Sequence, residues 1–136
     1  MAARRTAVPV HVVDGTWELF RHYYAGLPPH ADVRGREVGA VRGVLSSLLG
    51  LLREGARHVG VATDRVIESF RNDLWEGYKT GEGMDPVLHA QFRPLEDAIE
   101  ALGLALWPMV EHEADDALAS AALVAARDPG VSRVFV

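Results

Sequence analysis

Short apolar runs alternate with longer amphipathic stretches along this chain, and this alternation constrains the fold more than any other feature. The four runs are Val8–Val13, Val59–Thr63, Leu104–Trp107 and Val131–Val136. A β-α-β-α-β-α-β order implies a parallel sheet, because parallel neighbours need a crossover connection that is usually a helix. The 136 residues, 49% of them hydrophobic, suffice for one domain with a substantial core. We therefore predict an α/β fold with three layers, in which helices flank a mostly parallel sheet, as a single domain over residues 1–136.

Helical spacing of apolar residues marks the stretches between these runs. The predicted helices are Trp17–Ala25, Val38–Arg53, Pro86–Leu102 and Ala114–Arg127. Thr16 is the predicted N-cap of the first helix, and Gly103 is predicted to end the third. Residues 66–84 hold charges, aromatic side chains and three glycines with no helical or strand periodicity. We predict that this segment is irregular, either mobile or shaped around a substrate.

Acidic residues gather where the predicted strands end. The five acids are Asp14, Asp64, Glu113, Asp115 and Asp116. Asp14 and Asp64 directly follow the first two strands, and the other three lie where a loop becomes the last helix. Ligands of parallel sheets bind at the carboxyl ends of the strands, so the five side chains are expected to converge. At 3.6 residues per turn, Glu113 and Asp116 should share one helix face while Asp115 points elsewhere.

Five converging carboxylates call for a cation, because each acid raises the pKa of its neighbours unless positive charge compensates. Oxygen ligands without imidazole or thiolate favour Mg²⁺ or Mn²⁺ over zinc. Two such ions stabilise the attacking and leaving oxygens during phosphodiester cleavage. The helix dipole alone would explain Asp115 and Asp116, but it does not explain Asp14 and Asp64. The sequence therefore favours a metal site that cleaves phosphodiesters.

Composition excludes several other classes of function. The chain has no cysteine, which rules out disulfides, thiolate zinc sites and cysteine nucleophiles. A net charge of -5 argues against a protein that holds nucleic acid by bulk positive potential. The histidines and serines form no zinc-protease, nucleophile-elbow or phosphate-loop pattern. No apolar run approaches the roughly 18 residues needed to cross a bilayer, so we expect a cytoplasmic protein without a membrane partner.

Basic and aromatic residues in the irregular segment suggest contact with a phosphate backbone. Arg71 could grip a phosphate with two hydrogen bonds, Lys79 could neutralise the scissile phosphate, and Tyr78 could stack on a base. A solvated loop explains the same three residues equally well on sequence grounds.

Four motifs together give the chain a family resemblance. They are Val12-Val13-Asp14-Gly15, Asp64 followed by Phe70-Arg71, Tyr78-Lys79, and Glu113-Ala114-Asp115-Asp116. In this order and at these intervals they resemble the N-terminal part of the bacterial 5′-to-3′ exonuclease family, which includes the 5′ nuclease domain of DNA polymerase I and is related to flap endonucleases. The fold implied is of the PIN or 5′-nuclease type, and the implied substrate is DNA with a free 5′ end or a 5′ flap.

The resemblance also implies roles for individual residues. The metal ligands would be Asp14, Asp64, Glu113, Asp115 and Asp116, holding Mg²⁺ or Mn²⁺, with two ions in a complete site. Lys79 and Arg71 would meet the scissile phosphate as catalytic residues. Arg21, Tyr24 and Tyr78 would contact the substrate. The segment at about 66–85 would correspond to the helical arch through which a single strand or 5′ end is threaded.

The chain departs from the family pattern in three places. Thr80-Gly81-Glu82-Gly83 stands where the family commonly has a further arginine, and Glu111 stands where a glycine is usual. In the family, the strand matching Val134–Val136 leads into a further acidic motif and a helix-hairpin-helix region. Both are absent from these 136 residues, so we expect a fold truncated on its C-terminal side, with one metal site depleted.

Three functions remain open at this point. The first is a divalent-metal-dependent 5′ nuclease, in complete or fragmentary form. The second is an inactive or accessory fragment that binds nucleic acid without cleaving it. The third is a PIN-type ribonuclease, which shares the fold and the carboxylate chemistry and is complete at about this length. The Tyr78-Lys79 pair within a long connecting segment favours the first over the third.

Overall fold

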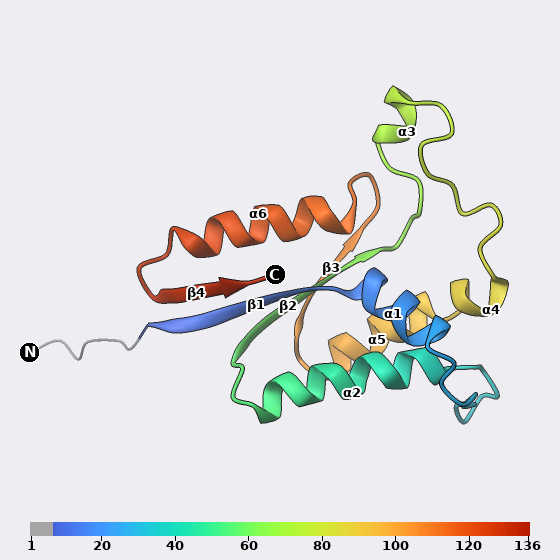
Figure 1. Cartoon of the computed structure of the whole chain (residues 1–136), viewed down its shortest axis with the longest axis horizontal. Helices are drawn as coiled ribbons and strands as arrows, with labels where there is room; N and C mark the ends of the chain where they lie inside the picture. The colour runs from blue at the N-terminus through green and yellow to red at the C-terminus, as the bar shows by residue number, and fades with distance from the viewer. Residues whose placement is uncertain (1–6) are drawn as a thin grey trace, which may run out of the picture.

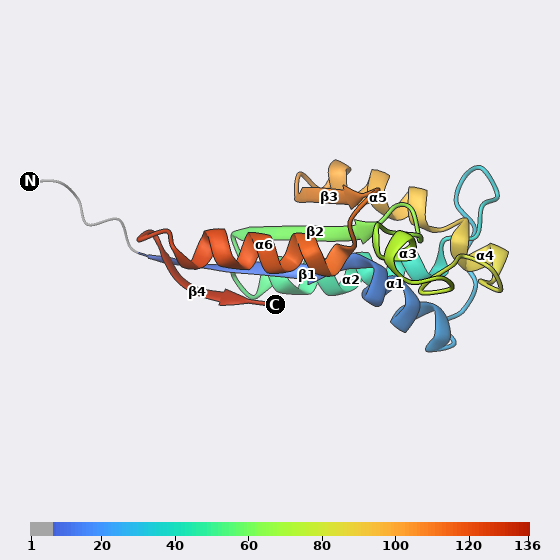
Figure 2. The ribbon, with the colours of Figure 1, turned by 90° about the horizontal axis from the view of Figure 1, so that it is seen from above.

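The computed structural model describes residues 7–136, and its centre is a four-stranded parallel sheet. The strands are β1 (Val8–Asp14), β2 (His58–Asp64), β3 (Ala105–Met109) and β4 (Val131–Phe135). They lie in the order β3-β2-β1-β4, and all three pairings are parallel (Figure 2). The predicted α/β fold is therefore confirmed, and within the described residues the sheet is parallel throughout.

Helices cover both faces of this sheet. The larger ones are α1 (Gly15–Tyr24), α2 (Gly39–Arg53), α5 (Phe92–Ala101) and α6 (Ala114–Ala126). Figure 1 shows α6 on one side of the strands and α2 and α5 on the other. This is the predicted three-layer arrangement. None of the helices in the described part of the chain has both the length and the apolar character needed to cross a bilayer.

Each face of the sheet has its own apolar cluster. On the α2 and α5 side, Val44, Val61 and Ile99 are fully buried among other aliphatic residues. On the α6 side, a smaller cluster joins Val12 and Leu118 to alanines of β2 and α6. Burial of each such aliphatic side chain contributes about 1.5–3 kcal/mol. The two clusters hold the helices against the sheet and thereby fix where the strand ends point.

Two acids form the carboxyl ends of the central strands. Asp14 is the last residue of β1 and Asp64 is the last residue of β2. Gly15 follows Asp14 in close contact with β2, where an added Cβ would lie 2.8 Å from the Val61 side chain. The absence of a side chain at Gly15 permits this close approach beside the paired ends of β1 and β2.

The N-cap of α1 was predicted wrongly. The carboxylate of Asp14, not the hydroxyl of Thr16, accepts the hydrogen bond from the Trp17 amide, at 2.8 Å. Thr16 lies inside the helix, and its hydroxyl accepts a hydrogen bond from the Asp64 amide at 2.8 Å. Aspartate is among the preferred N-cap residues, because its carboxylate can accept a hydrogen bond from the amide three residues later. Asp14 stands in this position relative to Trp17 and lies two residues before the predicted cap, Thr16.

The predicted helix over Pro86–Leu102 is two helices, α4 (Pro86–His89) and α5. Pro94 lies in the first turn of α5, where its missing amide is tolerated, and its ring disfavours continuation of a helix from α4. Gln91 lies at the break and is 1% exposed. Its Oε1 accepts hydrogen bonds from the Ala40 and Val41 amides at 3.1 and 3.3 Å, so it caps the start of α2.

The segment between β2 and α4 has little regular structure, as predicted. It contains one short helix, α3 (Arg71–Leu74), which stands apart from the sheet in Figure 1. Gly77 and Gly83 have positive φ angles of 71° and 82°, which fit its irregular path. Leu74 and Trp75 are 78% and 73% exposed. The segment thus extends from the strand ends with apolar side chains in solvent.

Candidate active site

A cavity of about 220 Å³ lies at the carboxyl ends of β1 and β2, and we call it the acidic cavity. Its lining residues are Asp14, Thr16, Trp17, Phe20, Asp64, Lys79, Glu113 and Asp115. Four of the five predicted metal ligands and one predicted catalytic residue therefore meet in one place, although they are separated by up to about 100 positions in the sequence.

Asp14 has a perturbed carboxyl group in the acidic cavity. Burial raises the pKa of its carboxyl group, while the hydrogen bond from the Trp17 amide lowers it. The negative charges of Asp115 and Asp64 raise the pKa further. This is the repulsion expected of converging carboxylates, and a bound cation would relieve it.

Asp64 is 5% exposed and bonded on both oxygens. Oδ1 accepts a hydrogen bond of 2.7 Å from the Ala114 amide at the start of α6, and Oδ2 pairs with Lys79 Nζ at 3.1 Å. The backbone of Asp64 is also held, since its amide donates to Thr16. Asp64 is therefore fixed by a strand, two helices and the irregular segment at once.

The carboxylate of Glu113 is contacted by several hydrogen-bond donors of the irregular segment. It is 7% exposed, and Ser69 Oγ donates to its Oε1 at 3.0 Å. Arg71 Nη1 lies 3.1 Å from Oε2, and Tyr78 donates to the same oxygen at 3.4 Å. Lys79 Nζ lies 3.9 Å from Oε1. These contacts bring Arg71, Tyr78 and Lys79 to the carboxylates, while the phosphate and base contacts expected of them stay predictions.

Asp116 lies beside Glu113, as predicted, since Arg71 Nη1 is 2.9 Å from Asp116 Oδ2 and 3.1 Å from Glu113 Oε2, but it does not line the acidic cavity. Asp115, which was expected to point elsewhere, does line it. Glu113 is the N-cap of α6 and has extended backbone angles (φ -96°, ψ 163°), so the helical spacing used in the prediction does not apply to it. As a result Glu113 and Asp115 share the acidic cavity. Asp116 accepts a hydrogen bond from the Glu113 amide at 2.9 Å.

Arg71 binds Asp116 with two hydrogen bonds, of 2.9 Å from Nη1 and 2.7 Å from Nη2. The guanidinium lowers the pKa of Asp116 to about 2, and the hydrogen bond from the Glu113 amide acts in the same direction. The carboxylate in turn raises the pKa of Arg71. The pair joins the irregular segment to the first turn of α6.

Within residues 7–136, no three acidic or histidine side chains are arranged closely enough to hold one metal ion together. Other partners engage the carboxylates instead. Lys79 and Arg71 neutralise Asp64, Glu113 and Asp116, while backbone amides occupy oxygens of Asp14 and Asp64. The donor set itself consists of carboxylate oxygens, which is the chemistry that Mg²⁺ and Mn²⁺ prefer.

Arg21 and Tyr24, two predicted substrate contacts, do not reach the acidic cavity. Arg21 pairs with Glu18 at 2.7 Å on the surface of α1. Tyr24 is 68% exposed and packs edge-on against Tyr23, with ring centroids 5.2 Å apart. Both remain available to a molecule that extends along α1 beyond the carboxylates.

Several residues around the site were not predicted from the sequence. Trp17 and Phe20 line the acidic cavity, and Trp17 is 64% exposed. Ser69 donates to Glu113. The positions of Trp17 and Phe20, three and six residues after Asp14 on one predicted helix, were the available signal, whereas Ser69 lies in a segment without periodicity.

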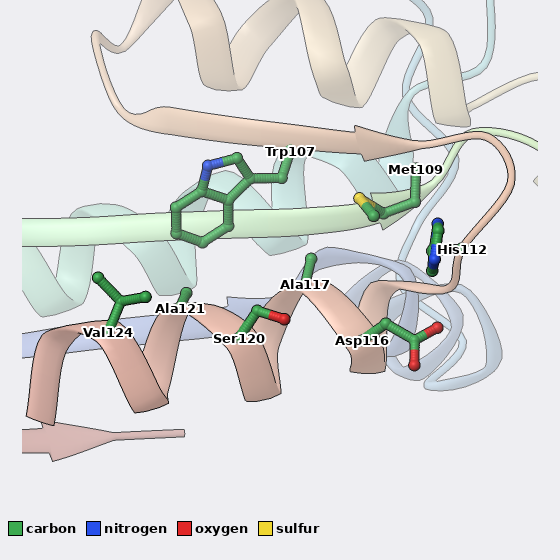
Figure 3. Close-up of a pocket in the computed structure, with 8 residues that line it drawn as sticks. All are labelled: Trp107, Met109, His112, Asp116, Ala117, Ser120, Ala121 and Val124. Atoms are coloured by element: carbon green, nitrogen blue, oxygen red, sulfur yellow. The ribbon is translucent and has the colours of Figure 1, made fainter.

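A second, more apolar cavity of about 520 Å³ lies between β3 and α6, and we call it the β3–α6 groove. Figure 3 shows Trp107 and Met109 of β3 facing Ala117, Ser120, Ala121 and Val124 of α6, with His112 and Asp116 at one end. Asp116 thus lines this groove and not the acidic cavity. The indole of Trp107 packs on Gly60 of β2, where any Cβ would overlap it.

Residues 9–136 match the family described as "5′-3′ exonuclease, N-terminal resolvase-like domain". The chain belongs to this family. The resemblance drawn from the sequence motifs is thereby confirmed. The family is one of nucleases that act on DNA, and its members generally depend on a metal ion.

Similar proteins include three bacterial DNA polymerases I. That of Deinococcus radiodurans is 34% identical over 110 residues, which are 80% of this chain and 11% of that protein. That of Pseudomonas aeruginosa is 36% identical over 116 residues, 84% of this chain and 13% of that protein. The thermostable DNA polymerase I of Thermus aquaticus is 36% identical over 120 residues, 88% of this chain and 14% of that protein. The chain thus spans only a small part of the length of these relatives.

Proposed function

We propose that this chain is a divalent-metal-dependent 5′-to-3′ exonuclease and flap endonuclease that cleaves DNA phosphodiesters. One observation carries the proposal, namely the meeting of Asp14, Asp64, Glu113 and Asp115 with Lys79 in the acidic cavity. Membership of the 5′-3′ exonuclease family supports the same reaction. The proposed substrate is DNA with a free 5′ end or a 5′ flap, and the proposed setting is the cytoplasm.

The four carboxylates of the acidic cavity would hold Mg²⁺ or Mn²⁺. When bound, such ions activate water and stabilise the charge that develops on the phosphate oxygens. The raised pKa of Asp14 supports this assignment, because burial and, to a lesser extent, the charges of Asp115 and Asp64 disfavour its carboxylate form, and a cation would compensate for both. Asp116 would take part indirectly, by holding Arg71 and the Glu113 amide.

Lys79 and Arg71 would bind the scissile phosphate. In the structure both are engaged by carboxylates, Lys79 by Asp64 and Arg71 by Asp116 and Glu113. Their side chains remain about one-third exposed, at 34% and 31%, so a phosphate entering the cavity can share their donors. Two positive side chains beside developing negative charge would stabilise the transition state.

Aromatic side chains near the entrance would contact the bases of the substrate. Tyr78 and Trp17 are 45% and 64% exposed beside the acidic cavity. Stacking of a base on an aromatic ring is worth about 1–3 kcal/mol and tolerates any sequence. Arg21 and Tyr24 are proposed to contact the strand farther along α1, where they lie on the surface.

Incubation with 5′-flap DNA and Mg²⁺ tests the proposal directly. The wild-type chain should release the flap, and Asp64→Asn and Asp115→Asn should each abolish release. Asp97→Asn is the matched control, because Asp97 is an exposed acid of α5 that pairs with Arg93. Cleavage that survives in Asp64→Asn would contradict a role for the acidic cavity.

Two other outcomes would identify the remaining alternatives. Preference for single-stranded RNA over flap DNA would indicate a PIN-type ribonuclease. Binding of DNA without cleavage at any Mg²⁺ or Mn²⁺ concentration would indicate an accessory nucleic-acid-binding fragment. The second outcome has structural motivation, since the described carboxylates form no ready group of three ligands.

A further inference from the structure

Glu96 is a buried acid that the acidic cavity does not explain. It lies on the sheet-facing side of α5 between Leu95 and Ile99, and is 2% exposed. A buried carboxylate costs several kcal/mol unless it is paired and hydrogen bonded. An apolar residue would fill the same space at lower cost, so the partners of Glu96 indicate what it does.

Its partners are the two residues on either side of Asp64. Thr63 Oγ1 donates to Glu96 Oε1 at 2.7 Å. Arg65 donates to Oε2 twice, from Nε at 2.9 Å and from Nη2 at 2.7 Å. One carboxylate on α5 therefore holds the chain immediately before and immediately after Asp64.

Because β2 is pleated, these contacts of Glu96 also fix the direction in which the Asp64 side chain points. Successive side chains of a strand point to opposite faces, so Thr63 faces Glu96 on the α5 side. Asp64 faces the α6 side, where it accepts the Ala114 amide and lines the acidic cavity. A shift of Thr63 or Arg65 would turn the Asp64 carboxylate away from the Ala114 amide and from the acidic cavity.

We propose that Glu96 is a positioning residue that orients Asp64 through Thr63 and Arg65. The inference rests on the proposed function, in which Asp64 is a metal ligand. Glu96 itself does not line the acidic cavity, so it touches neither substrate nor ion. Residues that hold a metal ligand in place without touching the ion act in the same way, and their loss commonly lowers metal affinity or activity by about 10–100-fold.

The test compares Glu96→Gln and Arg65→Gln with Arg93→Gln in the whole chain. Glutamine at position 96 keeps the size of the side chain and can still accept from Thr63, but it lacks the carboxylate oxygen that receives both Arg65 donors. Arg93 is the matched control, since it also approaches Glu96, at 3.9 Å, but is 67% exposed and remote from Asp64 in sequence. A milder pair, Thr63→Val and Thr63→Ser, removes or keeps the hydroxyl.

Two readouts separate positioning from simple stabilisation. The first is the half-saturating Mn²⁺ concentration of the folded protein in calorimetry, which should rise about tenfold or more in Glu96→Gln, Arg65→Gln and Thr63→Val. Thr63→Ser and Arg93→Gln should stay within about twofold of wild type. The second is hydrogen exchange of the Ala114 amide without metal, which should quicken in the first three variants because its acceptor is Asp64.

The outcomes distinguish failure of the inference from failure of the proposed function. A lower melting temperature with unchanged Mn²⁺ affinity and unchanged Ala114 exchange would show that Glu96 only stabilises the fold, and would overturn the inference. If Asp64→Asn binds Mn²⁺ as tightly as wild type, Asp64 is not a ligand and the proposed function fails. Ala114 exchange would still report whether Glu96 orients Asp64.

Discussion

The guanidinium of Arg71 lies against the carboxylate of Asp116, with N–H···O distances of 2.9 and 2.7 Å. Arg71 belongs to the segment between β2 and α4, and Asp116 belongs to the first turn of α6. The pair therefore joins a segment with little regular structure to the helix that carries the acidic motif. Its geometry also makes it sensitive to pH.

Acid should weaken the Arg71–Asp116 contact within a defined window. The pKa of Asp116 is lowered from 3.8 to about 2, chiefly by Arg71. An acid with a lowered folded-state pKa stabilises the fold above its unfolded pKa, and loses that contribution as the pH falls through the folded pKa. The free energy of urea unfolding should thus fall more steeply between pH 4 and pH 2 in wild type than in Asp116→Asn. Parallel curves for the two proteins would contradict the assignment.

Removing the charge of Lys79 should slow cleavage. Lys79 is the single lysine of the sequence and contacts Asp64 at 3.1 Å. Loss of one preorganised positive group beside the reacting phosphate should lower kcat by about 10²–10³-fold in Lys79→Met, while Lys79→Arg should retain more activity. Flap-release kinetics with saturating DNA provide the measurement. A change confined to KM would show that Lys79 binds substrate without stabilising the transition state.

Tyr23 should titrate above the ordinary range of a tyrosine hydroxyl. Its hydroxyl donates a 2.6 Å hydrogen bond to Asp85 at the start of α4, which is the chief reason that its pKa is raised to about 12. The raised pKa means that this contact stabilises the fold up to about pH 10 and is lost as the pH rises toward 12. Ultraviolet titration of phenolate formation should show a late step that disappears in Tyr23→Phe and persists in Tyr24→Phe. An unchanged late step in Tyr23→Phe would disprove the contact.

The main elements of the fold follow from local patterns, whereas their boundaries depend on distant contacts. β1 and β2 were predictable because their β-branched residues are buried in a parallel sheet. The break between α4 and α5 was not predicted, although Pro94 disfavours a continuous helix there; the contact that Gln91 makes at the break, with α2 amides about 50 positions earlier, could not be predicted. A polar side chain with so distant a partner has no signature in the sequence.

The composition of the site was more predictable than its geometry. Asp14 and Asp64 were placed correctly, since strand ends in a parallel sheet converge by topology. The prediction failed at Asp115, which lines the acidic cavity with Glu113, because Glu113 is the extended N-cap of α6 and helical spacing cannot be counted from it. Local backbone angles, which depend on the capping hydrogen bonds, decided which carboxylates share the acidic cavity.

The stacking of Trp107 on Gly60 gives a last prediction, about the β3–α6 groove. A Cβ at Gly60 would overlap the indole, so Gly60→Ala should displace Trp107 and lower the free energy of unfolding by about 1–3 kcal/mol, as other overpacking substitutions do. Gly50→Ala is the control, because Gly50 lies in α2 with open space around it and should gain about 0.5–1 kcal/mol.

Chemical denaturation followed by tryptophan fluorescence measures both effects of the Gly60 substitution. The double variant Gly60→Ala/Trp107→Leu should recover part of the stability lost in Gly60→Ala, because the smaller leucine leaves room for the new methyl group. Equal unfolding energies for Gly60→Ala and Gly50→Ala would mean that the indole does not rest on β2. If the losses of unfolding free energy from Gly60→Ala and Trp107→Leu add in the double variant, the two positions act independently. The position of Trp107 in the β3–α6 groove would then not depend on its contact with Gly60.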